Sequence, residues 1–146
     1  MSGLVTIEKT EAQWKHQASI YHREYGISHS VGSLDGTYIQ IRNIGDRTNW
    51  ICRKRYPAIN MTIMVDASGL ICYVSCRWPG SMHDSTVYRN TDLYRVANRP
   101  PPGRWEPFPG AVVLADSAYI GIVGDNLLLA HPRFRRLTAQ NARFYQ

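Results

Sequence analysis

Apolar residues near the start of the chain recur at the spacing of a helix. Between Glu8 and Tyr25 they lie three or four positions apart among polar residues, which predicts one apolar face on a helix. The apolar face consists of Trp14, Ala18, Tyr21 and Tyr25. Gly26 follows directly, and glycine commonly ends a helix.

Four later segments have the lengths and residue types of strands. Residues 31–41 alternate near their end, with an interruption at Asp35-Gly36. Residues 61–65 and 70–76 are apolar runs joined by a glycine-containing turn, which predicts a β-hairpin. Residues 110–115 form a continuous apolar run, which is typical of a strand buried on both faces.

The remaining segments predict one further helix and two less regular pieces. A helix is expected from Asp84 to about Ala97, with the side-chain oxygens of residues 84–86 as its cap. Three prolines and a glycine at 100–103 predict an extended linker. Three leucines at 127–129 form a last apolar patch, which we expect in a partial helix.

The order of these elements predicts a mixed α/β (α+β) fold with a mixed sheet. A three-stranded antiparallel meander would be followed by a helix and then by a parallel strand of the same sheet. We expect residues 1–30 to carry an N-terminal helix that leads into a domain formed by residues 31–146. In such sheets, ligands usually bind at strand ends.

The amino-acid composition limits the classes of protein to which the chain can belong. The 146 residues, 44% of them hydrophobic, suffice for one domain with a core and exclude a fibre or a disordered tail. Three cysteines without zinc-like pairing favour a reducing compartment. The chain has no apolar run of roughly 18 residues and no secretion signal near its start, which predicts an intracellular protein without a membrane partner.

Positive charge exceeds negative charge and is concentrated in one polar segment. Seventeen Lys and Arg against eleven Asp and Glu give a net charge of +6, which favours a polyanionic partner such as nucleic acid. In the exposed segment expected at 43–58, Arg53, Lys54 and Arg55 are candidates for contacts with DNA phosphates. The alternative is a solvated loop whose charge only aids solubility.

Three aspartates stand at the edges of apolar elements, each beside a small or turn-forming residue. If the first and last predicted strands are neighbours, Asp35 and Asp116 converge at one end of the sheet, and Asp84 meets them from the start of a helix. Clustered carboxylates repel one another unless a cation neutralises them, and hard oxygen ligands suit Mg²⁺ or Mn²⁺. The alternative is a turn at Asp35-Gly36, a helix cap at Asp84 and a closed turn at Asp116.

An ordered set of motifs resembles a known family. The motifs are residues 32–39 (GSLDGTYI), Arg53-Lys54, Asn60, residues 66–69 (DASG), residues 78–85 (WPGSMHDS) and residues 114–119 (LADSAY). In this order they are similar to those of Harbinger-type DDE superfamily transposases and the nucleases derived from them. As a set they are specific, although each one alone is weak.

The resemblance implies a ribonuclease H-like fold and metal-dependent cleavage of DNA. It matches Asp35 and Asp116 to the family's acids on the first strand and after the fourth, and Asp84 to an additional acid. The three would be the catalytic and metal-binding residues, with Mg²⁺ or Mn²⁺ as cofactor and DNA as substrate. A separate DNA-binding partner protein and residence in the nucleus would follow from the same resemblance.

The chain departs from the family at one catalytic position. The family's closing glutamate lies on a helix beyond the last strand, whereas glutamate occurs here only at positions 8, 11, 24 and 106. We therefore expect a domain truncated at its C-terminus, with low nuclease activity. The alternative functions are a domesticated, non-catalytic DNA-binding or protein-interaction remnant, and an unrelated basic α/β protein.

Overall fold

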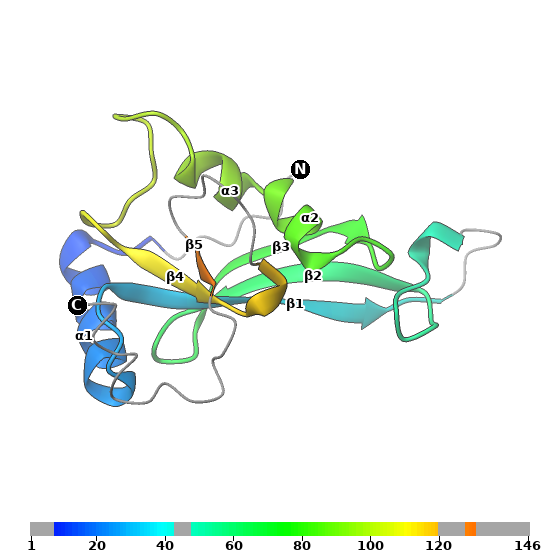
Figure 1. The fold of residues 1–146 in the computed structure, drawn as a ribbon, viewed down its shortest axis with the longest axis horizontal. Coiled ribbons are helices and arrows are strands. Elements are labelled where there is room, and N and C mark those ends of the chain that lie inside the picture. The colour runs from blue at the N-terminus through cyan, green and yellow to red at the C-terminus, as the bar shows by residue number, and fades with distance from the viewer. Residues whose placement is uncertain (1–7, 43–47, 120–127, 131–146) are drawn as a thin grey trace.

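The computed structural model describes residues 8–42, 48–119 and 128–130. Within these residues, the strands form a five-stranded mixed sheet in the order β3-β2-β1-β4-β5 (Figure 1). The strands are β1 (Ser30–Gln40), β2 (Ala58–Val65), β3 (Ile71–Pro79), β4 (Val112–Ala115) and β5 (Leu128–Ala130). The helices are α1 (Glu11–Tyr25), α2 (Asp84–Arg89) and α3 (Asp92–Ala97), with 3-10 turns η1 (Thr48–Trp50) and η2 (Ser117–Tyr119).

The first helix forms as its apolar spacing predicts, and it begins three residues later. The Thr10 side chain accepts a hydrogen bond from the Gln13 backbone, and the Gln13 side chain accepts one from the Thr10 backbone. At the other end, Gly26 adopts a left-handed conformation with φ of 69°, which favours glycine. Helix α1 is thus capped at both ends by residues of its own sequence.

The antiparallel meander and the parallel strand are both confirmed. Strand β1 pairs with β2 and β2 with β3, while β4 lies on the other side of β1 and runs parallel to it. Strand β1 pairs with its two neighbours along different parts of its length. Residues 30–34 pair with β4, and residues 33–40 pair with β2. The second half of β1 therefore extends beyond the end of β4 (Figure 1).

Three local predictions were wrong. The predicted helix at 84–97 is split, because the Thr91 hydroxyl accepts a hydrogen bond from the Tyr94 backbone and starts a new helix there. Residues 100–103 form a turn rather than an extended linker, since Gly103 N–H donates to the Pro100 carbonyl at 3.2 Å. The expected partial helix at 127–129 overlaps strand β5, which pairs with β4.

Helices α2 and α3 cover one face of the sheet, whereas α1 reaches that main core through Trp14 and Ala18 and packs on the opposite face through Tyr21. On one face, Tyr21 of α1 packs with Leu114 of β4. On the other face, Tyr88 of α2 and Leu93 of α3 belong to the main core, together with Leu34 of β1. Figure 1 shows α1 on one side of the strands and the α2–α3 pair on the other. No helix among the described residues is long and apolar enough to cross a membrane.

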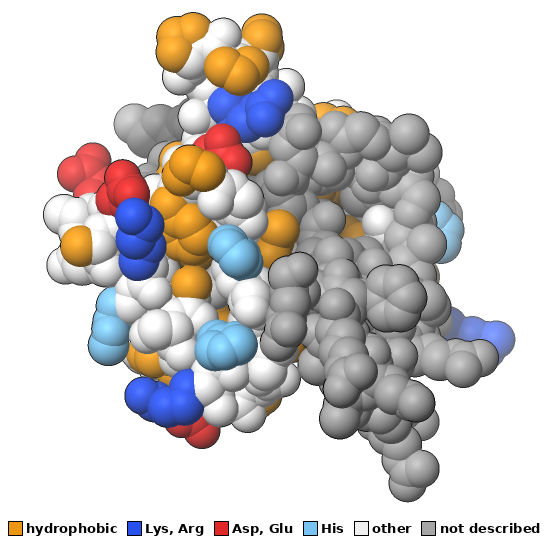
Figure 2. All heavy atoms as spheres, turned by 60° about the vertical axis from the view of Figure 1, so that its left-hand side comes forward, with side chains coloured by type: hydrophobic (Ala, Val, Ile, Leu, Met, Phe, Trp, Pro, Cys, Tyr) orange, Lys and Arg blue, Asp and Glu red, His pale blue; other side chains and the backbone are white. Residues whose placement is uncertain are grey.

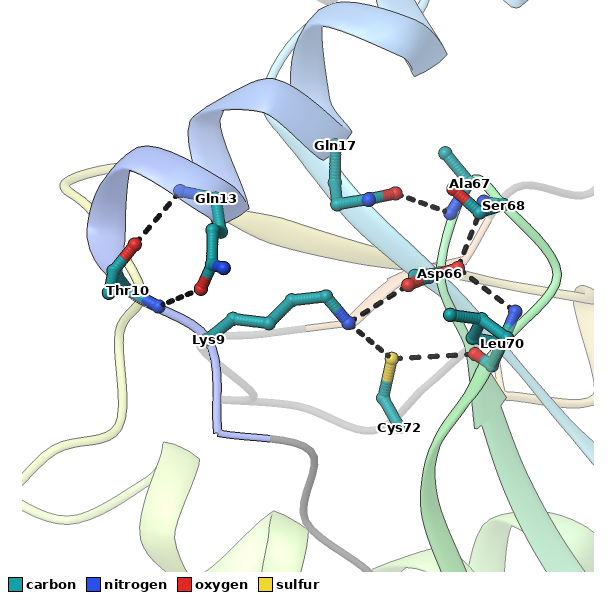
Figure 3. A network of polar contacts seen from close by, with 9 residues as sticks. All are labelled: Lys9, Thr10, Gln13, Gln17, Asp66, Ala67, Ser68, Leu70 and Cys72. Atoms are coloured by element: carbon teal, nitrogen blue, oxygen red, sulfur yellow. Dashed lines mark hydrogen bonds and ion pairs between the residues drawn. The ribbon is translucent and has the colours of Figure 1, made fainter.

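A buried ion pair ties the start of α1 to the β2–β3 turn (Figure 3). The Lys9 ammonium lies 2.9 Å from a carboxylate oxygen of Asp66, whose side chain is 1% exposed. The other oxygen of Asp66 accepts the backbone N–H groups of Ser68 and Leu70. Burial alone would raise the pKa of Asp66, but Lys9 and these two N–H groups outweigh it, so that the pKa lies below its usual range.

Removing the cation of this pair should destabilise the fold strongly. We expect Lys9→Met to lower the free energy of unfolding by about 3 kcal/mol, because it leaves the Asp66 charge buried without its partner. Lys15→Met is the matched control, since the Lys15–Glu11 pair is exposed and should contribute less than about 0.5 kcal/mol. Urea denaturation of both variants measures the difference, and equal losses would contradict this account.

The same pair predicts a pH dependence of stability. Because the pKa of Asp66 is lowered on folding, its contribution is complete above the unfolded value near ~3.9 and is lost as the pH falls through the folded pKa. We therefore expect the stability gap between the wild type and Lys9→Met to narrow below about pH 4. Denaturation curves at pH 3 and pH 7 would show it, and an unchanged gap would contradict it.

Candidate functional site

Asp35 and Asp116 come together because strands β1 and β4 are parallel neighbours. Leu34 and Ala115 are paired across the two strands, and the aspartates are the next residues of each. Strand β4 ends at Ala115, so Asp116 stands at its carboxyl end. The predicted adjacency of the first and last strands is thus confirmed.

The alternation of side chains along β1 indicates the face of the sheet on which Asp35 lies. The Tyr21 hydroxyl lies 2.8 Å from the Ser33 hydroxyl, and the Tyr21 ring packs with Leu114. Since side chains alternate along a strand, residues two positions later return to that face. By this alternation Asp35 lies on the same face of β1 as Ser33, while Asp116 directly follows the last residue of β4; both aspartates are exposed.

Backbone N–H groups hold one oxygen of each carboxylate. Gly36 N–H donates to Asp35 Oδ1 at 2.8 Å, and Ala118 N–H donates to Asp116 Oδ1 at 2.8 Å. The Asp116 carbonyl also accepts from Tyr119 N–H at 3.2 Å, so Asp116 closes the η2 turn as the alternative interpretation expected. In both carboxylates, the second oxygen has no hydrogen bond among the described residues.

Asp84 lies across strand β1 from the Asp35 side chain. A Cβ atom added to Gly36 would stand 2.6 Å from Asp84 Oδ1, so the carboxylate fills the space beside that glycine. Gly36 and Asp35 are consecutive residues of β1 and face opposite sides of the sheet. Asp84 Oδ1 accepts a hydrogen bond from Asn60 Nδ2 at 2.8 Å, and it does not cap α2 with its side chain.

The charges of the three aspartates act on one another and on a buried tyrosine. Burial raises the pKa of Asp35, the charges of Asp116 and Asp84 raise it further, and the Gly36 N–H and Arg53 oppose them. Burial, together with the charges of Asp84, Asp35 and Asp116, raises the pKa of Tyr119 far above its usual range. Tyr119 therefore stays neutral and packs edge-on against the Tyr88 ring.

The basic segment presents its three cations differently. The Arg53 guanidinium lies 5.9 Å from the centre of the Tyr38 ring and lines, with Asp84, a pocket of about 230 Å³. Lys54 and Arg55 are exposed in a turn closed by hydrogen bonds between Cys52 and residues 55 and 56. All three cations are exposed; Arg53 lies beside Tyr38 and Asp84, whereas Lys54 and Arg55 lie in the turn.

Charge on the rest of the described surface is mixed where it can be seen. On the face drawn in Figure 2, basic and acidic side chains are interspersed. Among the described residues, Lys15 pairs with Glu11 and Arg23 with Glu24. The positive surplus of the chain is not gathered on this part of the surface.

The donor set suits a hard divalent cation, but the three carboxylates do not meet at one point. Among the described residues, no group of three or more His, Cys, Asp or Glu is placed to hold a metal ion. Asp35 and Asp116 are candidates for a shared cation, because they follow paired residues of neighbouring strands and the Asp116 charge raises the pKa of Asp35. The expected contribution of Asp84 as a third ligand has no support from its placement across β1.

Sequence reasoning gave no role to Asn60, although its position carried a signal. Strand β2 alternates buried and half-buried positions, and Asn60 is a fully buried polar residue in that pattern. Its Nδ2 donates to both Asp84 Oδ1 and the Met82 carbonyl, at 2.8 and 3.0 Å. A polar residue at an inward position of an apolar strand indicates such a partner. His83, which precedes Asp84, is exposed and makes no capping hydrogen bond with its side chain.

Comparison with known protein families decides the affiliation of the chain. A family model described as DDE superfamily endonuclease matches residues 34–145, well over half of the sequence. The chain belongs to the DDE superfamily endonucleases. No curated protein and no solved structure gives a match. The matched range contains all three aspartates, and the mixed sheet is that of a ribonuclease H-like nuclease fold, as expected. DDE endonuclease domains generally use divalent metal ions.

Proposed function

We propose that this DDE endonuclease domain is of the Harbinger type and binds a divalent cation, Mg²⁺ or Mn²⁺, between Asp35 and Asp116. The observation that supports the proposal is the parallel pairing of Leu34 with Ala115, which makes Asp35 and Asp116 the next residues of two neighbouring strands. The substrate would be a DNA phosphodiester, as in the family. Residence in the nucleus and a separate DNA-binding partner are parts of the same proposal.

Each residue of the pair has a defined contribution. The Gly36 and Ala118 N–H groups occupy one oxygen of each carboxylate, which leaves the other oxygens for the cation. Asp35 and Asp116 would hold the cation, which would supply activation of a water for attack on the phosphodiester. The Arg53 charge, which favours ionised Asp35, is placed to attract a phosphate toward this edge of the sheet.

The rate of cleavage by the 146-residue polypeptide should be low. Its sequence contains no glutamate after Asp116, and the described residues do not assemble a third ligand. We expect weak Mn²⁺-dependent nicking of supercoiled plasmid, reduced to background by Asp35→Ala. Rapid nicking that Asp35→Ala abolishes would contradict the expectation of low activity, and nicking that persists in Asp35→Ala would contradict the site.

A second candidate function is a DNA-binding remnant without catalysis. The absence of a three-ligand group among the described side chains favours it. Calorimetric titration separates the two: Mn²⁺ binding that Asp35→Asn abolishes supports the nuclease site. Salt-sensitive DNA binding without any metal binding supports the remnant.

DNA binding should depend on Lys54 and Arg55, two exposed cations of the basic segment. We expect Lys54→Ala/Arg55→Ala to weaken binding of duplex DNA regardless of its sequence, because phosphate contacts carry no base information. The slope of log K against log salt should fall by about 0.9 for each lost phosphate contact. Fluorescence anisotropy measures both, with Lys15→Ala on α1 as control. An unchanged slope would assign this segment to solubility alone.

A further inference from the structure

A continuous series of contacts leads from the sheet interior to the Asp35 carboxylate. Asn60 is fully buried in β2, and its Nδ2 donates to Asp84 Oδ1 at 2.8 Å. The Asp84 carboxylate stands directly over Gly36, where a Cβ would be 2.6 Å from it. The Gly36 N–H then donates to Asp35 Oδ1 at 2.8 Å, on the opposite face of β1.

The two groups that contact the Asp84 carboxylate, the Asn60 amide and Gly36, are themselves held in place. The Asn60 side chain is held by a second hydrogen bond, from Nδ2 to the Met82 carbonyl at 3.0 Å. On the other side, Gly36 is paired in register with Thr62 of β2. The Asp84 carboxylate therefore lies between the buried Asn60 amide and the Gly36 peptide, whose N–H binds Asp35.

We propose that Asp84 is a positioning residue: held by Asn60, it fixes the Gly36 peptide and so orients the Asp35 carboxylate. This inference rests on the proposed role of Asp35 in holding the cation. It gives a physical reason for the glycine after Asp35, because any side chain there would displace the Asp84 carboxylate. It also separates Asp84 from the ligands, since its own contacts are with Asn60 and Gly36.

Two substitutions at Asp84 distinguish positioning from ligation. Asp84→Asn retains an oxygen that accepts from Asn60 and the same volume over Gly36, but it loses the charge that a ligand needs. We expect it to keep Mn²⁺ affinity within about threefold of the wild type, whereas Asp84→Ala should lose about tenfold. Asp35→Asn, which removes a proposed ligand, should lose about a hundredfold or more.

The measurement is calorimetric titration with Mn²⁺ on the full chain at one pH, after thermal melting has shown that each variant is folded. Asn60→Ser removes the same hydrogen bond from its other end and replaces Asp84→Ala if that variant does not fold. Loss of binding in Asp84→Asn equal to that in Asp35→Asn would overturn the inference, and so would wild-type affinity in Asp84→Ala. Wild-type affinity in Asp35→Asn would instead overturn the proposed function.

Discussion

Mn²⁺ at a hundred times its dissociation constant should raise the melting temperature of the wild type by about 5–10 °C. It should leave that of Asp35→Asn unchanged, because a cation between Asp35 and Asp116 binds only the folded protein and needs both carboxylates. Differential scanning fluorimetry with and without Mn²⁺ measures the shift. Na⁺ at matched ionic strength is the control for screening.

Without metal ion, Asp35→Asn should have a higher melting temperature than the wild type at neutral pH. Since burial and the neighbouring charges of Asp116 and Asp84 raise the pKa of Asp35, its ionised form costs stability above the folded pKa. Asp35→Asn removes this cost and should melt above the wild type. The advantage should vanish as the pH falls below the unfolded value near ~3.9, where Asp35 is neutral in both states. A variant that melts lower than the wild type at every pH would contradict the assigned repulsion.

Gly36→Ala should be among the most damaging single changes on strand β1. The new Cβ would lie 2.6 Å from Asp84 Oδ1, so the carboxylate must move and lose its hydrogen bond to Asn60. We expect a loss of about 2–3 kcal/mol in the free energy of unfolding, the usual cost of a hydrogen bond to a charged group combined with overpacking. Elsewhere in a strand, alanine in place of glycine is favourable by roughly 0.5–1 kcal/mol.

Two further variants make the Gly36 prediction specific. Gly103→Ala is the control, because its added Cβ would have no neighbour closer than 3.8 Å. In the double variant Gly36→Ala/Asp84→Ala the clash is gone, and we expect it to be no less stable than Asp84→Ala alone. Urea denaturation of the wild type, Gly36→Ala, Asp84→Ala and the double variant measures the coupling, and additive losses would show that the two residues act independently.

The elements that could be predicted from the sequence are those whose pattern is local. Helix α1 and the β2–β3 hairpin follow from residue spacing and from the turn at 66–69. The break between α2 and α3 could not be foreseen from apolar spacing, because one hydroxyl, that of Thr91, decides it. Strand β5 is only three residues long, and its pairing with β4 makes it a strand.

The candidate site also has a part that could be predicted from the sequence and a part that could not. The proximity of Asp35 and Asp116 could be predicted from the sequence, because each directly follows apolar residues of a predicted strand and the two strands pair in parallel. The side on which Asp84 lies depends on which face of the sheet α2 covers, and sequence spacing does not determine that. Asn60 is named by its motif, but its contact with Asp84 joins residues 24 positions apart and appears only in the fold.

The central claim is that Asp35 and Asp116 hold the same ion, and a double-mutant cycle on Mn²⁺ binding tests it most directly. Calorimetric titration of the wild type, Asp35→Asn, Asp116→Asn and the double variant gives the four affinities. If the carboxylates share one cation, either single change removes nearly all the binding that the double change removes. Losses that add independently, or a single variant that binds Mn²⁺ as the wild type does, would contradict the claim.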